Sequence, residues 1–221
     1  IGVRLVGSEM CIRDSATMTR ADLAFATSEL SRYLSAPSKT HLQLAKHVLA
    51  YLKGKPDRGL TFKTGGDEIL SGFSDATWAN DPETRRSVSG YVFLFNGTAV
   101  SWKSKLEHTV ALSSSESEYQ AIARAAQEAS YLRQLLKELG APQLSPTTIF
   151  EDNEGCIAMV KNPAAREKAK HIDIKVKYVN QQYEEGVIKP VSCRTDKMVA
   201  DDFTKAVPRV TIEKHLPQYS V

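Results

Sequence analysis

The sequence predicts a mixed α/β fold that follows a short helical segment, and three observations predict it. Apolar residues recur at helical spacing up to about residue 54, whereas their period changes to two after residue 67. The dipeptide Asn96-Gly97, which favours a tight hairpin turn, separates two of the resulting strands. Beyond residue 113 helices and strands alternate, which is typical of a mixed sheet covered by helices.

Two helices are expected before the sheet. The first begins near Asp22 and ends before Pro37, and the second ends at Gly54 and Pro56, as a glycine followed by a proline predicts. The second helix carries its apolar residues on one face: Leu42, Ala45, Val48, Leu49 and Leu52. Residues 64–67 then read as a turn or linker between two units.

The second unit begins with strands and continues with alternating helices and strands. Three antiparallel strands are expected over 69–75, 89–95 and, from residue 98, to about 101. The longest helix is expected over 114–139, because serines 113–115 offer an N-cap and Gly140 and Pro142 close it. Next come a strand over 147–151, apolar on both faces and hence interior, a short helix over 153–161, a helix over 171–185, a strand over 187–193 and a last helix over 199–205.

The chain begins at Ile1 rather than Met, so we expect a fragment of a longer protein. Residues 1–15 fit poorly with the rest of the chain and are expected to be a non-native or disordered leader. The remaining boundaries are expected at 16–65 for the helical segment, 66–208 for the α/β domain and 209–221 for a C-terminal tail.

Composition excludes several classes of protein. A hydrophobic content of 42% and a charged content of 25% are those of a globular protein, not of a disordered, collagen-like or coiled-coil chain. No apolar run reaches the roughly 18 residues of a membrane helix, so no membrane partner is expected. Three cysteines, an odd number, argue against a disulfide framework and for a reducing, intracellular setting.

The net charge of +3 is small, but the basic residues are clustered. Residues 16–65 hold eight basic and three acidic side chains, a net charge of +5, and residues 161–177 hold six and two, a net charge of +4. Two such segments predict a surface for a polyanion, the alternative being ordinary solvated helix faces. The candidate phosphate contacts are Lys46, Lys53, Lys55, Lys168 and Lys170, with Arg85 and Arg86 in the turn after the first strand and Lys103 and Lys105 after the third.

Four acids, Asp75, Glu118, Asp152 and Asp201, lie where structure alone would not place them. Asp75 and Asp152 end strands, Glu118 shares the apolar stripe of the long helix, and Asp201 opens the last helix. Unpaired buried carboxylates are costly, so a cation between them is the best explanation. Mg²⁺ prefers such oxygen ligands, and two ions about 4 Å apart can hold both the attacking and the leaving oxygen of a phosphodiester.

Each acid also has a structural interpretation. Asp75 and Asp152 could be strand-end turn residues, and Glu118 and Asp201 could be acids that favour a helix N-terminus. Asp202 keeps that second interpretation. Glu116 lies about 200° around the helix from Glu118, so it is expected to point away from the sheet and to help the helix dipole. Trp78 and Trp102 could stack on nucleic acid, but we expect them to be buried.

The chain resembles the ribonuclease H domain of copia-type retrotransposon Pol polyproteins, on motifs that match in order and spacing from about residue 68 to 208. The motifs are Phe73-Ser-Asp75-Ala-Thr-Trp78, Thr84-Arg-Arg-Ser-Val-Ser-Gly-Tyr-Val-Phe93, Ser101-Trp-Lys-Ser-Lys105, Ala111-Leu-Ser-Ser-Ser-Glu-Ser-Glu-Tyr119, Asp152-Asn153, Lys170-His-Ile-Asp173 and Ala200-Asp-Asp-Phe-Thr-Lys205. Upstream, Thr19-Arg-Ala-Asp-Leu-Ala-Phe25 and Tyr51-Leu-Lys-Gly54 resemble the end of a reverse transcriptase, its thumb or connection.

The resemblance implies a ribonuclease H-like fold, a five-stranded mixed sheet flanked by helices, that cleaves the RNA strand of RNA–DNA hybrids with two Mg²⁺ or Mn²⁺ ions. It assigns both the catalytic and the metal-binding role to Asp75, Glu118, Asp152 and Asp201. Residues 193–199 contain no histidine, although other ribonucleases H often use one there for product release. The rest of the Pol polyprotein would be a partner, in a cytoplasmic virus-like particle or in the nucleus.

Two other functions remain open from sequence. An integrase shares the fold, although the motifs and the upstream helices favour a ribonuclease H. A non-catalytic nucleic-acid-binding remnant of a decayed or domesticated retroelement is the second alternative, and the presence of all four acids argues against it.

Overall fold

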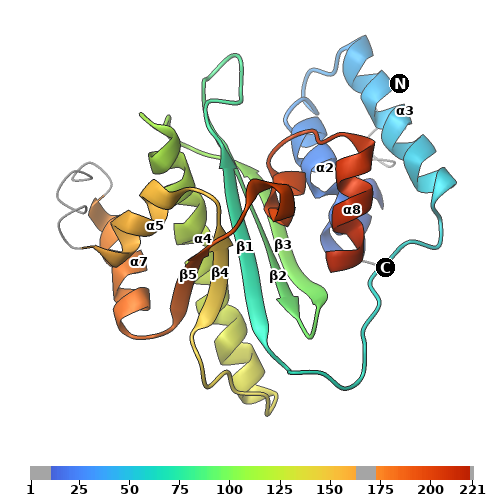
Figure 1. Ribbon diagram of the computed structural model, residues 1–221. Helices are drawn as coiled ribbons and strands as arrows, with labels where there is room; N and C mark the ends of the chain where they lie inside the picture. Colours follow the sequence, from blue (N-terminus) through green and yellow to red (C-terminus); the bar gives the residue numbers. More distant parts are fainter. Residues whose placement is uncertain (1–10, 163–172, 220–221) are drawn as a thin grey trace.

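A five-stranded sheet lies between two groups of helices in the computed structural model, which describes residues 11–162 and 173–219 (Figure 1). The strand order is β3-β2-β1-β4-β5. β1 and β2 pair antiparallel, as do β2 and β3, whereas β4 pairs parallel with β1 and with β5. The predicted mixed sheet flanked by helices is therefore confirmed. The strands are Leu70–Thr77, Val88–Phe95, Thr98–Leu106, Thr147–Glu151 and Ile188–Ser192.

The hairpin between β2 and β3 forms as predicted, but β3 is longer than expected. Asn96 and Gly97 have φ angles of 52° and 75°, the positive values that a two-residue hairpin turn of this kind requires. β3 then pairs along the whole of β2, from Phe95 opposite Thr98 to Val88 opposite Leu106. The lysines at 103 and 105 consequently lie within β3, not after it, because alternating polar side chains on one face do not interrupt backbone pairing.

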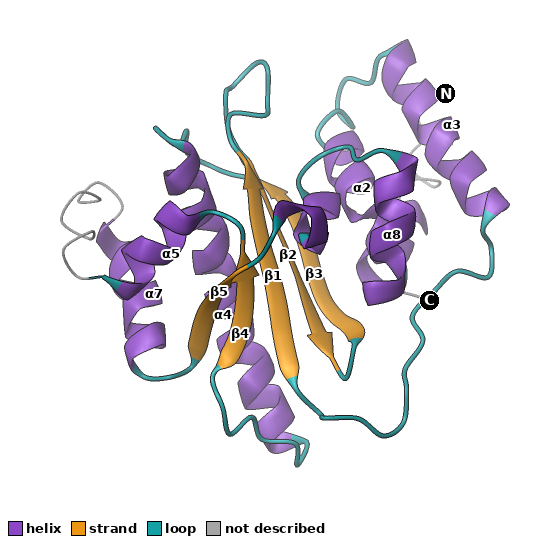
Figure 2. Ribbon diagram, in the orientation of Figure 1, coloured by secondary structure: helices purple, strands orange, loops and turns teal. Residues whose placement is uncertain are grey.

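Three helices cover one face of the sheet: α4 (Ser114–Glu138), α5 (Glu154–Lys161) and α7 (Asp173–Glu184), shown in purple in Figure 2. The long helix α4 begins as predicted, because the Ser113 side chain accepts a hydrogen bond from the Glu116 N–H at 3.1 Å. Its buried stripe packs against the sheet in one large core. The central members of that core are Phe93, Tyr119, Ile122, Ala126, Ile149 and Val179.

The other face of the sheet is covered by segments that the sequence only partly predicts. The expected last α-helix is a 3-10 helix, η4 (Val199–Phe203), and it is not the last element. Residues expected to form a C-terminal tail instead form the helix α8 (Arg209–Tyr219), in which Leu216 and Tyr219 are buried. They pack with Met198 and Phe203 of the η4 region, so α8 is part of the core on this face.

The N-terminal helices lie beside β3, near α8 (Figure 1). They comprise η1 (Ala21–Leu23), α2 (Ala24–Ser31) and α3 (Lys39–Gly54), preceded by a helical stretch over residues 11–18. Ile12 is buried in a small core with Leu23 and Val48, and the Trp102 indole donates a hydrogen bond to the Ala16 carbonyl at 2.7 Å. The origin of residues 1–15 and the division of the chain near residue 65 stay predictions.

Among the described residues, no helix combines the length and the apolar character needed to cross a membrane.

Candidate active site

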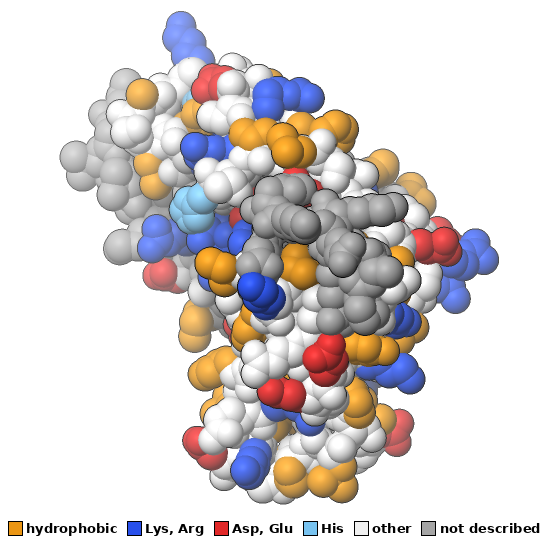
Figure 3. Space-filling model, turned by 90° about the vertical axis from the view of Figure 1, so that its left-hand side faces the viewer, with side chains coloured by type: hydrophobic (Ala, Val, Ile, Leu, Met, Phe, Trp, Pro, Cys, Tyr) orange, Lys and Arg blue, Asp and Glu red, His pale blue; other side chains and the backbone are white. Residues whose placement is uncertain are grey.

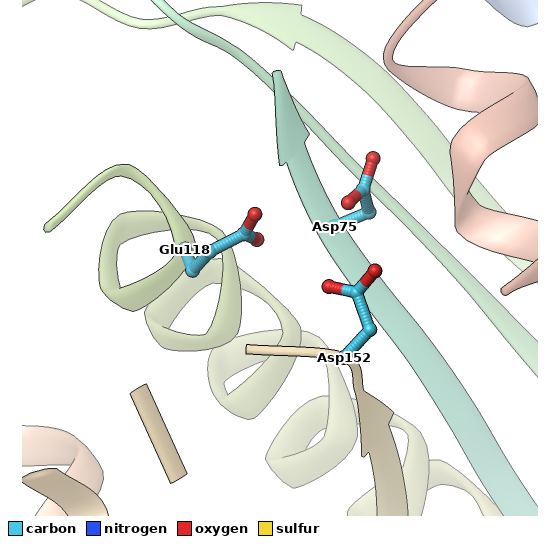
Figure 4. A group of neighbouring side chains, drawn as sticks. All are labelled: Asp75, Glu118 and Asp152. Carbon is cyan, nitrogen blue, oxygen red and sulfur yellow. The ribbon is translucent and has the colours of Figure 1, made fainter. Parts of the chain in front are cut away.

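Three of the four predicted acids meet at one edge of the sheet (Figure 4). Asp75 lies near the end of β1, Asp152 directly follows β4, and Glu118 comes from the first turns of α4. The parallel pairing of β1 with β4 brings the ends of both strands to the same edge. One carboxylate oxygen from each acid lies within 4.8 Å of the others. The helix phase that places Glu118 in line with Ile122 is thus the one that the structure has.

Burial and mutual repulsion disfavour the ionised forms of the buried acids in this group. Asp75 and Glu118 are buried, with 4% and 6% of their surface exposed, whereas Asp152 is partly exposed. Burial, together with the charge of Asp201, raises the pKa of Asp75 to about 7. Burial, followed by the charges of Glu151 and Asp75, raises the pKa of Glu118 to about 11. Such shifts measure how poorly the site tolerates its own negative charge without a cation.

Asp201, the fourth predicted acid, lies beside this group rather than within it. Its Oδ1 atom forms an ion pair of 2.6 Å with Nζ of Lys205, four residues further along the chain. Burial disfavours the charge on Lys205, but the nearby carboxylates, Asp201 first among them, raise its pKa above the ordinary value. The Thr204 hydroxyl donates a hydrogen bond to Asp75, so the turn after η4 is attached directly to the site.

Two further residues belong to the site, and sequence reasoning missed both. Glu151, the last residue of β4, is fully buried, and burial raises its pKa well above the ordinary value. Its Oε1 atom accepts a hydrogen bond from the Asn153 N–H at 3.3 Å. The Thr195 hydroxyl donates to Asp152 at 2.9 Å, from the loop that follows β5. A carboxylate at the end of an interior strand could have indicated Glu151 from the sequence. Nothing in the sequence indicates the role of Thr195.

The side chains of Glu118 and Glu151 indicate that a cation fits the group of acids at the ends of β1 and β4. The Oε2 atom of each is buried and, among the described residues, has no hydrogen-bond partner. Buried carboxylate oxygens without donors are costly unless a positive charge faces them. Oxygen ligands of this kind are those that hard divalent cations take. The residues therefore fit a divalent ion held by Asp75, Glu118 and Asp152.

Two neighbouring acids have structural roles. Glu116 is turned away from the metal group as predicted, but it is buried rather than exposed, and its Oε2 atom accepts a hydrogen bond from the Leu112 N–H at 2.7 Å. Asp202 lies in the first turn of η4, as expected of an acid near a helix N-terminus, but its side chain has partners that the sequence did not predict. It is buried between His215 Nδ1 at 3.0 Å and the Tyr219 hydroxyl at 2.9 Å, and both partners come from α8.

The predicted phosphate contacts are dispersed over the surface. The lysines at 46, 53 and 55 are exposed on α3 and at its C-terminal end, and Arg85 is exposed in the turn after β1. Arg86 and Lys105 are half-buried, and Lys103 is exposed. The lysines at 168 and 170 lie outside the described residues. On the face shown in Figure 3, basic and acidic side chains are interspersed. Nucleic-acid binding by these residues stays a prediction.

The expected burial of both tryptophans is wrong for Trp78. The residue is 48% exposed, and its indole N–H donates a hydrogen bond to the Ala111 carbonyl at 2.9 Å. Trp102 is half-buried under the N-terminal helices.

Comparison with known proteins gives the chain a family, although no family model matches it. It is 37% identical over 195 residues, 88% of its length, to the retrovirus-related Pol polyprotein from transposon TNT 1-94 of Nicotiana tabacum. It is 33% identical over 203 residues to the corresponding polyprotein from transposon RE1 of Arabidopsis thaliana. A shorter stretch of 115 residues is 52% identical to the secreted RxLR effector protein 161 of Plasmopara viticola and covers 81% of that protein.

The fold and the relatives lead to one class. The sheet, the flanking helices and the order of the elements are those of a ribonuclease H-like fold. The chain belongs to the family of retrovirus-related Pol polyproteins of copia-type transposons. It spans 14% of the length of the tobacco and RE1 polyproteins.

Similar solved structures are ribonuclease H domains. One is LC11-RNase H1 from compost, with a TM-score of 0.44 and 18% identity over 67% of this chain and 99% of that chain. Another is the N-terminal RNase H domain of rv2228c from Mycobacterium tuberculosis, with a TM-score of 0.44 and 13% identity over 67% of this chain and 96% of that chain.

Proposed function

We propose that this chain is a metal-dependent endonuclease that hydrolyses the RNA strand of RNA–DNA hybrids during reverse transcription. The observation that carries the proposal is the convergence of Asp75, Glu118 and Asp152 at the edge of the sheet, with oxygens within 4.8 Å of one another. The retrotransposon relatives and the ribonuclease H-like fold support the substrate class.

Asp75, Glu118 and Asp152 would hold a divalent ion, which we propose to be Mg²⁺, with Mn²⁺ able to replace it. When bound, such an ion supplies Lewis-acid activation of the phosphodiester and of the attacking water. Asp201 would add a ligand for a second ion. The partner in the longer protein would be the reverse transcriptase portion of the polyprotein.

The chain's own residues orient these ligands. Thr204 donates to one oxygen of Asp75 and leaves its other oxygen available. Thr195 does the same for Asp152, which is the most exposed acid of the group and would otherwise have the greatest freedom to rotate. The burial of Glu118 and Glu151 keeps water away from one side of the site, which strengthens electrostatic interactions there.

Matched substitutions in α4 test the proposal. The Glu118→Gln variant keeps the shape of the side chain but removes a charge from the metal group, so it should fold, bind hybrid and lose cleavage. The Glu116→Gln variant makes the same change two residues away and should cleave normally, because Gln still accepts the Leu112 hydrogen bond. The assay is cleavage of labelled RNA–DNA hybrid by the full chain with Mg²⁺, Mn²⁺ or a chelator.

Two outcomes would contradict the proposal. Normal cleavage by Glu118→Gln would remove that carboxylate from the mechanism. Hybrid binding without cleavage in either metal, for the unaltered chain, would favour the non-catalytic nucleic-acid-binding remnant instead. Duplex DNA and single-stranded RNA serve as control substrates.

A further inference from the structure

The segment from Asp201 to Lys205 brings a positive charge of the chain itself against the acidic site. Asp201 is buried, with 6% of its surface exposed, and yet its Oδ1 atom lies 2.6 Å from Lys205 Nζ. The lysine side chain remains 41% exposed, so its stem reaches the carboxylate from the solvent side. The ammonium is therefore positioned at the rim of the site.

The backbone of this turn is held in place at both ends. The Lys205 N–H donates to the Asp201 carbonyl at 3.2 Å, which closes the turn. The neighbouring Thr204 hydroxyl donates to Asp75, which belongs to the metal group. Lys205 consequently begins from a fixed backbone position beside Asp75, while its four-carbon stem remains free to swing.

We propose, on the basis of the function proposed above, that Lys205 is a tethered cation that competes with a divalent ion for Asp201. The three-acid group of Asp75, Glu118 and Asp152 does not include Asp201, whose near oxygen is already taken by the ammonium. A first ion can bind the three acids without disturbing that pair. A second ion that uses this Oδ1 atom of Asp201 must displace the ammonium, so the second ion binds weakly.

The residue type suits this role. A lysine is a compact point charge on a flexible stem, whereas an arginine would hold the carboxylate with a rigid, bidentate fork. A displaced lysine also stays beside the site and returns when the ion leaves. Occupation of the second position, and with it cleavage, would therefore rise over a higher range of metal concentration than occupation of the first.

Metal titration of the full chain, without substrate, tests the inference. Binding of Mn²⁺ is measured by calorimetry and by the paramagnetic resonance signal of the free ion. The unaltered chain should bind one ion tightly and a second weakly. In Lys205→Met the second ion should bind about tenfold more tightly or better, the size expected when one nearby opposing charge is removed, and the first should be little changed.

Three variants complete the test. Lys205→Arg should retain the weak second ion, because the charge is kept. Lys197→Met, which removes an exposed lysine from the segment before η4, should behave like the unaltered chain and controls for net charge. In the double variant Asp201→Asn, Lys205→Met the gain should vanish, since the contested ligand is gone. Circular dichroism checks that each variant is folded.

The outcomes separate this inference from the proposed function. If Lys205→Met binds its second ion no more tightly than the unaltered chain does, the competition is refuted while the three-acid site stands. If the unaltered chain binds two ions with equal, high affinity, the competition is refuted as well. If it binds no divalent ion at all, both this inference and the proposed function fail.

Discussion

Two groups of buried acids differ in their partners. Like Asp75 and Glu118, the acids at 22, 81 and 107 are buried, yet each of these three accepts a hydrogen bond from an arginine. Burial alone would raise the pKa of Glu107, but the bonds from its arginine bring that pKa below the ordinary value. In the acidic site the opposite holds, and the pKa values of Asp75 and Glu118 are raised. The arginine donors are Arg20, Arg32 and Arg124.

The difference teaches how this chain treats a buried negative charge. Where a carboxylate has an architectural role, the chain supplies the positive charge itself, as Arg124 does for Glu107 with bonds of 2.6 and 2.8 Å. At the edge of the sheet the chain supplies less positive charge than the acids need. A group of buried acids that lowers the stability of the fold and does not improve its packing is typical of a functional site.

The largest expected effect comes from breaking one of the architectural pairs. Arg124→Met leaves Glu107 buried and unpaired, which should lower the free energy of unfolding by about 3–5 kcal/mol. The double variant Arg124→Met, Glu107→Gln should recover most of that loss, since no charge is then buried. Urea denaturation measures both. A loss below about 1 kcal/mol in the single variant would erase the contrast between the two groups of acids.

The pKa of Asp75 is raised, whereas that of Glu107 is lowered, so the two acids should change the stability of the chain with pH in opposite directions. The pKa of Asp75 is about 7 in the folded chain and about 4 when unfolded, so the folded state binds the proton more tightly. Stability of the metal-free chain should therefore be greatest below about pH 4 with respect to this group, and it should fall as the pH rises from about 4 to 7.

Asp75→Asn should remove that dependence and stabilise the metal-free chain at pH 8 by about 2–4 kcal/mol. Denaturation curves in a chelator at pH 5, 6, 7 and 8 measure the difference between the two proteins. Added Mg²⁺ should stabilise the unaltered chain at pH 8 and stabilise the variant much less. Equal pH profiles for the two proteins would mean that Asp75 is not under electrostatic strain.

A smaller effect is expected at Asp202, the neighbour of Asp201 that has an architectural role. Tyr219→Phe removes one of its hydrogen bonds and leaves a buried carboxylate oxygen without that donor, so it should cost about 1–3 kcal/mol. Tyr131→Phe, at an exposed position of α4, is the control and should change stability by less than about 0.5 kcal/mol. Thermal unfolding measures both variants.

The smallest effect on stability is expected from lysine side chains that face solvent. Replacing Lys46, Lys53 and Lys55 by Gln should alter the free energy of unfolding by no more than about 0.5 kcal/mol per site. The same triple variant should bind RNA–DNA hybrid more weakly. The slope of the logarithm of the binding constant against the logarithm of the salt concentration should become shallower by about 0.9 for each lost phosphate contact. Cleavage at saturating substrate should be unchanged. Binding that does not respond to salt would refute a phosphate-binding role.

Periodicity and helix phase predict much of the fold and the centre of the site. Asp75 and Glu118 are found where they were expected because a strand of period two and a helix of period 3.6 each fix which side chains face inward. Asp152 follows from the same reasoning, since it ends an interior strand. These are local rules, and they need no knowledge of distant partners.

The features that sequence reasoning missed depend on distant partners. Asp202 reads as an ordinary helix-start acid until His215, thirteen residues later, is known to lie against it. Residues 209–219 contain Pro217 and few apolar residues, so they read as a tail, although Tyr219 is fully buried. The role of Thr195 likewise appears only when its loop folds back onto Asp152.

The hydrogen bond from Thr204 to Asp75 joins residues 129 positions apart and has a consequence for how the protein is made. Strands β1 to β3 are neighbours in sequence and can pair while the chain is still leaving the ribosome, whereas the contacts of Asp75 with Asp152 and Thr204 must wait for later segments. A chain that ends after β3 thus has three of the five strands and, of the three acids, only Asp75. The acidic site is therefore complete only after the last turn closes on the first strand.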